Sequence, residues 1–163
     1  MNHGIHHINI HTPNLNRLRQ FYERAFGFEL VFEHYLEDFP EFVSTLTGID
    51  APAAHVVTMR TKNCFIELFQ WSSPEGKPLE PLRPYDFGYT HFAVAVDDIE
   101  ATHARLVELG MEFVHAPLKV QVNGGEYGSA YGCDPDGNII ELTEIPNGDN
   151  MSLGVLGRTA PAE

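Results

Sequence analysis

The chain contains two similar halves, and this internal repeat constrains its fold more than any other feature. Each half begins with a segment in which apolar and polar residues alternate, 5–11 in the first half and 89–96 in the second. A helical pattern that ends at a glycine follows in each half, at Gly27 and at Gly110, and then three more strand-like segments. Each half is therefore predicted to fold as strand, helix, strand, strand, strand.

The repeat predicts a division of the 163 residues into modules. The predicted parts are a first βαβββ module at 1–74 with an inserted loop at about 37–52, a proline-rich linker at 75–88, a second βαβββ module at 89–145 and a C-terminal tail at 146–163. In the first half, we predict a helix over 15–26 and strands over 28–35, 54–59 and 64–71. In the second half, we predict a helix from an Asp97–Glu100 capping box to 109 and strands over 111–115, 127–133 and 139–144. The predicted fold class is α+β.

Four ionisable residues occupy equivalent places in the two halves. His7 and His91 lie in the first strand of each half, and Glu67 and Glu141 lie in the last. Because strand side chains alternate between faces, the His and the Glu of each half are expected on the side of the sheet opposite the helix. Four such groups that point into one cavity would be costly unless a cation neutralised them. We therefore expect His7, Glu67, His91 and Glu141 to bind one divalent first-row metal ion (Ni, Co, Mn, Fe or Zn).

Other residues on the same strand faces are candidates for lining a substrate pocket. They are Asn9, His11, Phe65, Phe69, Trp71, Tyr127 and Tyr131. A plain core position is an equal alternative for the aromatic residues of the first half, and a structural role is an alternative for His11. The remaining histidines are expected to be structural or on the surface.

The charge balance excludes several classes of partner. The chain has 10 Lys and Arg against 23 Asp and Glu, which gives a net charge of −13. Such a surface repels nucleic acid and anionic membranes, and no apolar run is long enough to span a bilayer. The two cysteines cannot form a disulfide framework, and they favour a cytoplasmic location.

With these residues the chain resembles the vicinal oxygen chelate superfamily, which includes glyoxalase I, methylmalonyl-CoA epimerase, extradiol dioxygenases and bleomycin-resistance proteins. The segments that resemble it are His7-Ile8-Asn9-Ile10, Phe21-Tyr22-Glu23-Arg24-Ala25-Phe26-Gly27-Phe28, His91-Phe92-Ala93-Val94-Ala95-Val96-Asp97-Asp98-Ile99 and Asp134-Pro135-Asp136-Gly137-Asn138-Ile139-Ile140-Glu141-Leu142. The resemblance implies paired βαβββ modules that form a curved, cup-like mixed sheet with helices outside. It also implies a small-molecule substrate that chelates the metal through adjacent oxygens, and a homodimer.

The ligand set directs the functional hypothesis. Four ligands match the glyoxalase I and epimerase type, whereas ring-cleaving dioxygenases usually have only three. We therefore expect a lyase or isomerase that removes a proton next to a carbonyl and stabilises a metal-bound enediolate, with Glu141 as the base and Glu67 as the group that returns the proton. A departure from bacterial glyoxalase I is His11, which stands where those enzymes usually have an arginine. The alternatives are an Fe(II) or Mn(II) ring-cleaving dioxygenase and a non-catalytic protein that binds a small molecule such as an antibiotic.

Overall fold

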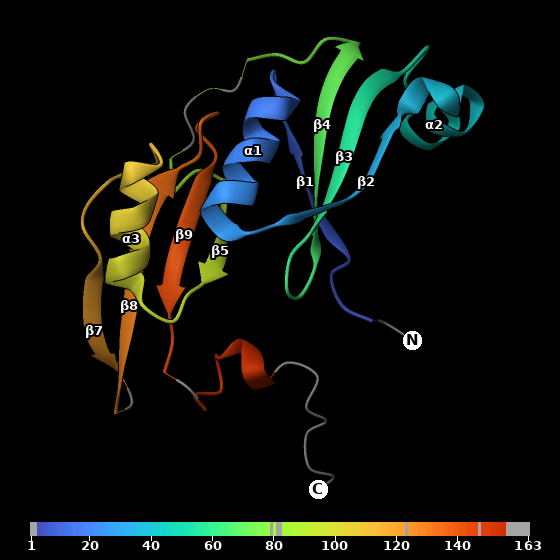
Figure 1. Ribbon diagram of the computed structural model, residues 1–163. Helices are drawn as coiled ribbons and strands as arrows, with labels where there is room; N and C mark the ends of the chain where they lie inside the picture. Colours follow the sequence, from blue (N-terminus) through green and yellow to red (C-terminus); the bar gives the residue numbers. More distant parts are fainter. Residues whose placement is uncertain (1–2, 79, 81–82, 123, 147, 156–163) are drawn as a thin grey trace, which may run out of the picture. The chain divides into compact units, whose positions relative to one another are not determined.

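The structure, a computed structural model, forms two compact units, Met1–Glu80 (unit 1) and Pro81–Glu163 (unit 2). It describes residues 3–78, 80, 83–122, 124–146 and 148–155. Each unit has a mixed sheet and helices of its own (Figure 1). The predicted α+β class is confirmed.

Unit 1 contains a four-stranded sheet. Its elements are β1 (His7–His11), α1 (Leu15–Phe26), β2 (Glu29–Tyr35), the 3-10 helix η1 (Leu36–Asp38), α2 (Pro40–Thr47), β3 (Ala53–Arg60) and β4 (Phe65–Ser73). The strand order is β1-β4-β3-β2, in which β1 runs parallel to β4 and the other pairs are antiparallel. The first strand begins at His7, two residues later than the alternation predicts.

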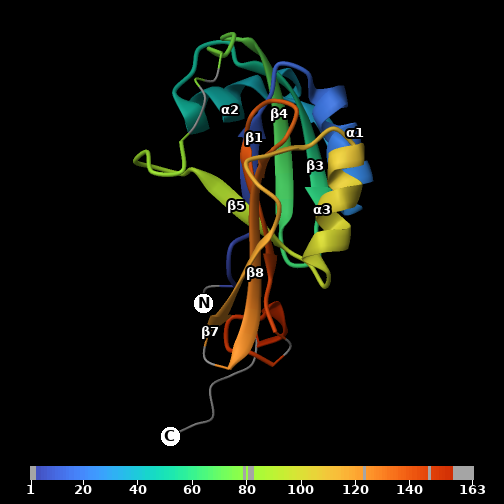
Figure 2. The same ribbon diagram turned by 90° about the vertical axis from the view of Figure 1, so that its left-hand side faces the viewer.

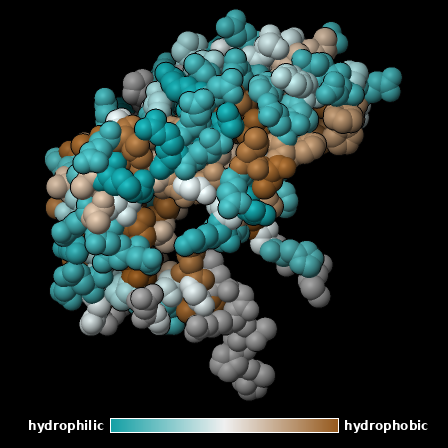
Figure 3. All heavy atoms as spheres, viewed as in Figure 1, coloured by the Kyte–Doolittle hydropathy of each residue, from teal (hydrophilic) through white to brown (hydrophobic). Residues whose placement is uncertain are grey.

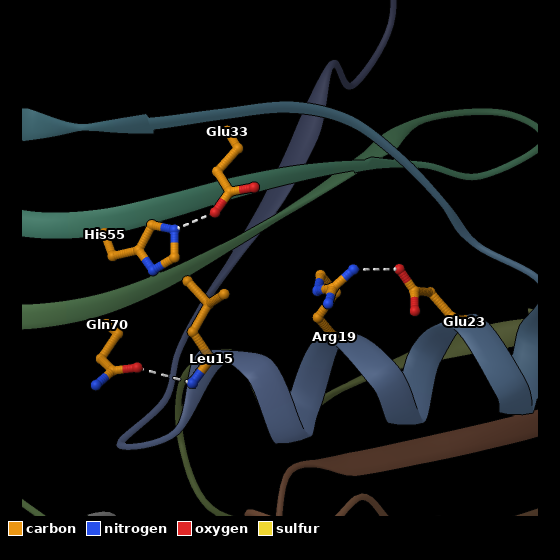
Figure 4. Close-up of polar contacts among 6 residues, drawn as sticks. All are labelled: Leu15, Arg19, Glu23, Glu33, His55 and Gln70. Carbon is orange, nitrogen blue, oxygen red and sulfur yellow. Dashed lines mark hydrogen bonds and ion pairs between the residues drawn. The ribbon is translucent and has the colours of Figure 1, made fainter.

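Helix α1 covers one face of this sheet. Asn14 caps its first turn by accepting a hydrogen bond from the Arg17 amide, and Gly27 ends it in the left-handed conformation with φ 66°. Buried Leu18 and Tyr22 lie on its inner side. The side chain of Gln70 in β4 accepts a hydrogen bond of 2.9 Å from the Leu15 amide and so ties the helix start to the sheet (Figure 4).

Helix α2 lies on the opposite side of the same sheet, as the view in Figure 2 shows. The sequence predicts an inserted loop over about 37–52, but much of this segment is helical. Pro40 opens the helix and Gly48 ends it with φ 71°, a start and stop pattern that the loop interpretation overlooked. Buried Val43 packs with Leu36 and Val56. Strand β3 is consequently buried on both faces.

Unit 2 repeats the plan with one additional strand. Its elements are β5 (His91–Ala95), α3 (Ile99–Glu108), β6 (Glu112–Phe113), β7 (Leu118–Val122), β8 (Gly125–Cys133), β9 (Ile139–Glu144) and the 3-10 helix η2 (Leu153–Val155). The strand order is β5-β9-β8-β6, with β5 parallel to β9. The predicted strand over 111–115 shrinks to two residues, and β7, which the sequence reading missed, pairs with β8 (Figure 2).

Two local details of unit 2 concern the start of α3 and the packing against β8. Asp98, not Asp97, is the N-cap of α3, because its carboxylate accepts a hydrogen bond of 2.9 Å from the Ala101 amide. On β8, a Cβ at Gly132 would lie 2.8 Å from both the Met111 and the Phe113 side chains. Glycine at this position therefore lets the segment around β6 pack directly against β8.

The surface follows the composition. Hydrophilic side chains predominate on the face drawn in Figure 3, as a net charge of −13 suggests. In the part of the chain that the structure describes, no helix has the length and apolar character needed to cross a membrane.

Candidate metal centre

The predicted pair of unit 1 lies on the sheet face opposite α1, here called the ligand face. In the parallel register Asn9 is opposite Glu67, so His7 is its diagonal neighbour on the same face. The Nε2 atom of His7 is 3.4 Å from Oε2 of Glu67. The structure thus brings together the two ligand candidates of the first half.

The predicted pair of unit 2 has the same register. Ala93 is opposite Glu141, so His91 again lies diagonally to the carboxylate. The Nε2 atom of His91 is 3.3 Å from Oε2 of Glu141. The repeat in the sequence is therefore a repeat in geometry, down to the ring nitrogen and the carboxylate oxygen.

These distances suit donors that share one ion. Two ligand atoms at about 2.1 Å from a first-row ion, and at ordinary coordination angles, lie roughly 3.2 Å apart. A direct charge-assisted hydrogen bond between imidazolium and carboxylate would be shorter, at about 2.7–2.9 Å. The imidazole and carboxylate donors fit a divalent first-row metal.

The second nitrogen of each imidazole also has a partner. Nδ1 of His91 is 3.0 Å from Oγ1 of Thr90, and Nδ1 of His7 is 2.9 Å from Nδ1 of His6. With the proton of His7 and of His91 on Nδ1, Nε2 of each ring keeps the unprotonated lone pair that a metal ligand needs. His6 precedes β1, so strand alternation does not govern its direction, and its contact with His7 was not predicted.

The second oxygen of each carboxylate accepts a hydrogen bond from a hydroxyl group. Oγ of Ser129 donates to Oε1 of Glu141 at 2.8 Å, and Oγ1 of Thr58 donates to Oε1 of Glu67 at 3.3 Å. Each Oε2 is thereby left to face its histidine. The sequence analysis missed Thr58 and Thr90, whereas Ser129 shares a strand face with Tyr127 and Tyr131 and was expected to reach the substrate with them. Thr90 directly precedes His91 in the sequence, and Thr58 is opposite Glu67 in the strand register.

Tyr131 is a predicted pocket residue that contacts a ligand pair directly. Its hydroxyl is 3.3 Å from Nε2 of His91, and the two rings meet edge to face with centroids 5.1 Å apart. Burial and the negative charge of Glu141 raise the pKa of Tyr131. The phenol therefore stays protonated at neutral pH and can donate a hydrogen bond at this site.

Three pocket candidates of unit 1 form one aromatic group on the ligand face. The ring of His11 stacks on Phe69 with centroids 5.6 Å apart, and Phe69 stacks on Trp71 at 6.0 Å. Burial of the His11 ring lowers its pKa, so the imidazole is predominantly neutral at neutral pH. Phe65 lies at the other end of this face, 5.0 Å from the ring of His6.

Two further candidates have less direct relations to the ligands. Asn9 is exposed on β1 and shares the ligand face with Glu67. The hydroxyl of Tyr127 is hydrogen-bonded to the carboxylate of Asp149, which raises the pKa of Tyr127 and lowers that of Asp149. Tyr127 is thus connected to the segment after β9.

Each unit taken alone holds a pair of metal-ligand candidates. Among the residues that the structure describes, neither unit contains three or more His, Cys, Asp and Glu side chains close enough to hold an ion.

Comparison with known proteins agrees with the fold. The model of the glyoxalase/bleomycin resistance protein/dioxygenase superfamily matches residues 4–142, and the chain belongs to this superfamily. A glyoxalase family protein from Bacillus cereus is similar in structure, with a TM-score of 0.76, 24% identity, and coverage of 88% of this chain and 95% of that one. A glyoxalase family protein from Enterococcus faecalis has a TM-score of 0.63 at 26% identity, over 87% of this chain and 98% of its own.

A resistance protein is also among the similar structures. The fosfomycin resistance protein FosX from Listeria monocytogenes has a TM-score of 0.61 and 20% identity, and the match covers 90% of this chain and 97% of that one. At this identity the similarity concerns the fold alone. Membership of the superfamily rests on the match of the family model to residues 4–142.

Proposed function

We propose that the protein is a divalent-metal-dependent lyase or isomerase that removes a proton from carbon next to a carbonyl. The observation that carries this proposal is the repeated pair, His7 with Glu67 and His91 with Glu141, at 3.4 and 3.3 Å between facing donor atoms. One ion would take its four protein ligands from the two pairs, which come either from one chain or from two copies. When bound, the ion supplies Lewis-acid stabilisation of the negative charge that develops on the carbonyl oxygen.

The residues of the chain divide the remaining work. The carboxylate of Glu141 would accept the proton from carbon after it loosens from the ion, while the hydrogen bond from Ser129 holds Oε1 in place. Glu67, similarly held by Thr58, takes up a proton from water and delivers it to the product, and Glu141 releases the abstracted proton to water. Tyr131 donates a hydrogen bond from its protonated hydroxyl toward a substrate oxygen, in keeping with its raised pKa.

Proton exchange tests the proposal directly. The protein is loaded in turn with Ni, Co, Mn, Fe(II) and Zn in deuterated water. It is then offered the methylglyoxal–glutathione hemithioacetal and methylmalonyl-CoA, and deuterium at the activated carbon is followed by NMR. Metal-dependent deuterium incorporation supports the proposal. Absence of exchange with every metal, together with oxygen uptake on catechol by the Fe(II) or Mn(II) form, would replace it by the ring-cleaving alternative.

The variant Glu141→Gln tests the assignment of the base. We expect turnover to fall by about 10²–10⁴-fold, the usual contribution of a general base, while the protein keeps much of its affinity for metal. Glu112→Gln, a change of an exposed carboxylate on β6, is the matched control and should leave turnover intact. A fully active E141Q would show that Glu141 is not the base.

We also propose that the chain forms a homodimer. Unit 1 exposes apolar side chains on the outer side of α2, where Phe42 is 68% and Leu46 is 71% exposed, and Phe32 on the edge strand β2 is 58% exposed. Large apolar side chains that are exposed in this way favour a contact with another protein surface. Light scattering after size exclusion should give twice the monomer mass, and a monomer at micromolar concentration would refute this part of the proposal.

A further inference from the structure

We propose that His11, Phe69 and Trp71 form an apolar subsite on the ligand face of unit 1 that accepts a planar aromatic group of the substrate. The inference names the substrate class for the proposed function and rests on it. It concerns unit 1 alone, in which the three aromatic side chains and Glu67 belong to the same sheet.

The register aligns the aromatic group with the ligand pair. Asn9, Glu67 and Thr58 are mutual partners across β1, β4 and β3, and the next positions on the same face are His11, Phe69 and Val56. Trp71, opposite Ala54, follows one step further. The ligand face therefore changes from polar to aromatic within two residues of Glu67.

The rings form a continuous surface. His11 stacks on Phe69 with an interplanar angle of 30°, and Phe69 stacks on Trp71 with 26°. His11 also lies 6.0 Å from Trp71. Because the His11 ring is predominantly neutral, it contributes a flat face without the cost of desolvating a charge.

The segment that carries η1 and α2 supports this surface from one side. Leu36 and Val43 are buried with Ala54 and Val56, and Phe69 and Trp71 pack against this cluster. Both rings remain only half-buried, so they keep accessible surface. A preformed apolar wall of this kind costs a ligand little reorganisation.

The spacing sets the size of the group that fits. Along a strand, two residues span about 6.6 Å, so Phe69 lies about that far from Glu67 and Trp71 about twice as far. A substrate whose oxygens bind at the ligand pair reaches Phe69 with a ring placed one or two carbons beyond those oxygens. A substrate with a methyl group in that position leaves the rings uncovered.

The equivalent positions of unit 2 offer no such wall. Ala95, Thr143 and Ser129 stand where unit 1 has His11, Phe69 and Val56. The side chains of unit 2 at this place are small or polar. The repeat therefore supports a subsite of this kind in unit 1 and not in unit 2.

The test uses Trp71, which is the only tryptophan of the chain. The zinc-loaded protein is titrated with lactate and with 3-phenyllactate, which have the same pair of adjacent oxygens and differ by a phenyl group. Tryptophan emission and calorimetry report binding. We expect 3-phenyllactate to change the emission of Trp71 and to bind at least about tenfold more tightly than lactate, because a ring contact adds to the burial of apolar area.

Variants separate the subsite from the metal centre. Phe69→Leu keeps apolar volume but removes a ring, and His11→Ala removes the stacked imidazole. Each should abolish most of the preference for phenyllactate and leave lactate binding unchanged. Phe113→Leu, which removes a ring that packs on His103 in unit 2, is the matched control and should keep the preference.

The outcomes distinguish the two proposals. Equal affinity for the two acids, with binding that depends on zinc, would refute the aromatic subsite and leave the proposed chelation intact. Failure of both acids to bind the zinc-loaded protein would overturn the chelation and the subsite together. Loss of the phenyllactate preference in F69L and H11A, but not in F113L, supports the subsite.

Discussion

The two units carry the same pair of ligand candidates but surround it differently. In unit 1 the carboxylate Glu67 accepts a 3.3 Å hydrogen bond from Thr58, and in unit 2 Glu141 accepts one of 2.8 Å from Ser129. Beyond Glu67 the sheet continues into stacked rings that are backed by α2, whereas beyond Glu141 it continues into Thr143.

This difference suggests that the strand register and the residues next to each pair determine different properties of the site. The register places a histidine diagonally to a glutamate in both units and so determines the donor atoms. The neighbours differ because, among the residues that the structure describes, only the first repeat has a helical segment between its second and third strands. We infer that the donor pairs serve the chemistry common to both halves, and that the neighbours determine which substrate is accepted.

Removal of one histidine from either unit is expected to have the largest effect. His7→Ala and His91→Ala should each lower metal affinity by at least about 100-fold, because each deletes a donor that the proposed ion shares. Competition with a chelator measures the affinity, and His103→Ala on α3 is the control. If one of the two variants binds metal as the wild type does, the two pairs are not equivalent halves of one centre.

A substitution on β8 tests the packing that distinguishes the units. Gly132 occupies the register position that buried Met59 has in unit 1, opposite the residue that precedes the glutamate. In Gly132→Ala the new Cβ would lie 2.9 Å from the backbone oxygen of Glu112. We expect the free energy of unfolding to fall by about 1–3 kcal/mol, as is usual for overpacking.

Gly76→Ala provides the control for this prediction. No atom lies within 4 Å of a Cβ at Gly76, so its stability should be close to that of the wild type. Urea denaturation compares the two variants. Equal midpoints for both would show that unit 2 tolerates a side chain on β8 as unit 1 does on β3.

The hydroxyl groups behind the carboxylates offer a finer comparison. Ser129→Ala should weaken metal binding by about tenfold, the lower end of the effect of losing a partner behind a ligand. Thr58→Val should have a smaller effect because its hydrogen bond is longer. Calorimetric titration with Zn²⁺ measures both, and the reverse order of effects would contradict the argument from hydrogen-bond length.

The smallest expected effect concerns pH and unit 1. Burial lowers the pKa of His11 below 6.5, so the folded state favours the neutral ring. As the pH falls below 6.5, His11 of the unfolded chain binds a proton before His11 of the folded protein does. The stability gained from the neutral ring is therefore lost progressively between pH 6.5 and the pKa of His11 in the folded state. His11→Phe should therefore show a smaller decrease in Tm between pH 7.5 and 5 than the wild type. An NMR titration that places the pKa of His11 above 6.5 would contradict this prediction.

Much of the fold follows from local sequence signals. The bounds of α1 and β9 are as predicted, since Asn14, Gly27 and the turn before Ile139 determine them by local hydrogen bonds and backbone conformation. Helix α2 was mistaken for a loop although Pro40 and Gly48 bound it, because an eight-residue helix shows too few apolar repeats. Strand β7 was missed because its residues are all exposed and it is stabilised by pairing with β8.

The sequence by itself determined the repeat, the α+β class and the identity of the ligand candidates. Alternation along a strand is a local property, and it groups His7 with Asn9 and Glu67 with Phe69 on one side of their own strands. Only the tertiary structure decided which strands are neighbours, and therefore that Nε2 and Oε2 face each other in both units. It also decided that His11, Phe69 and Trp71 form one stack, because contacts between strands depend on a register that no single segment encodes.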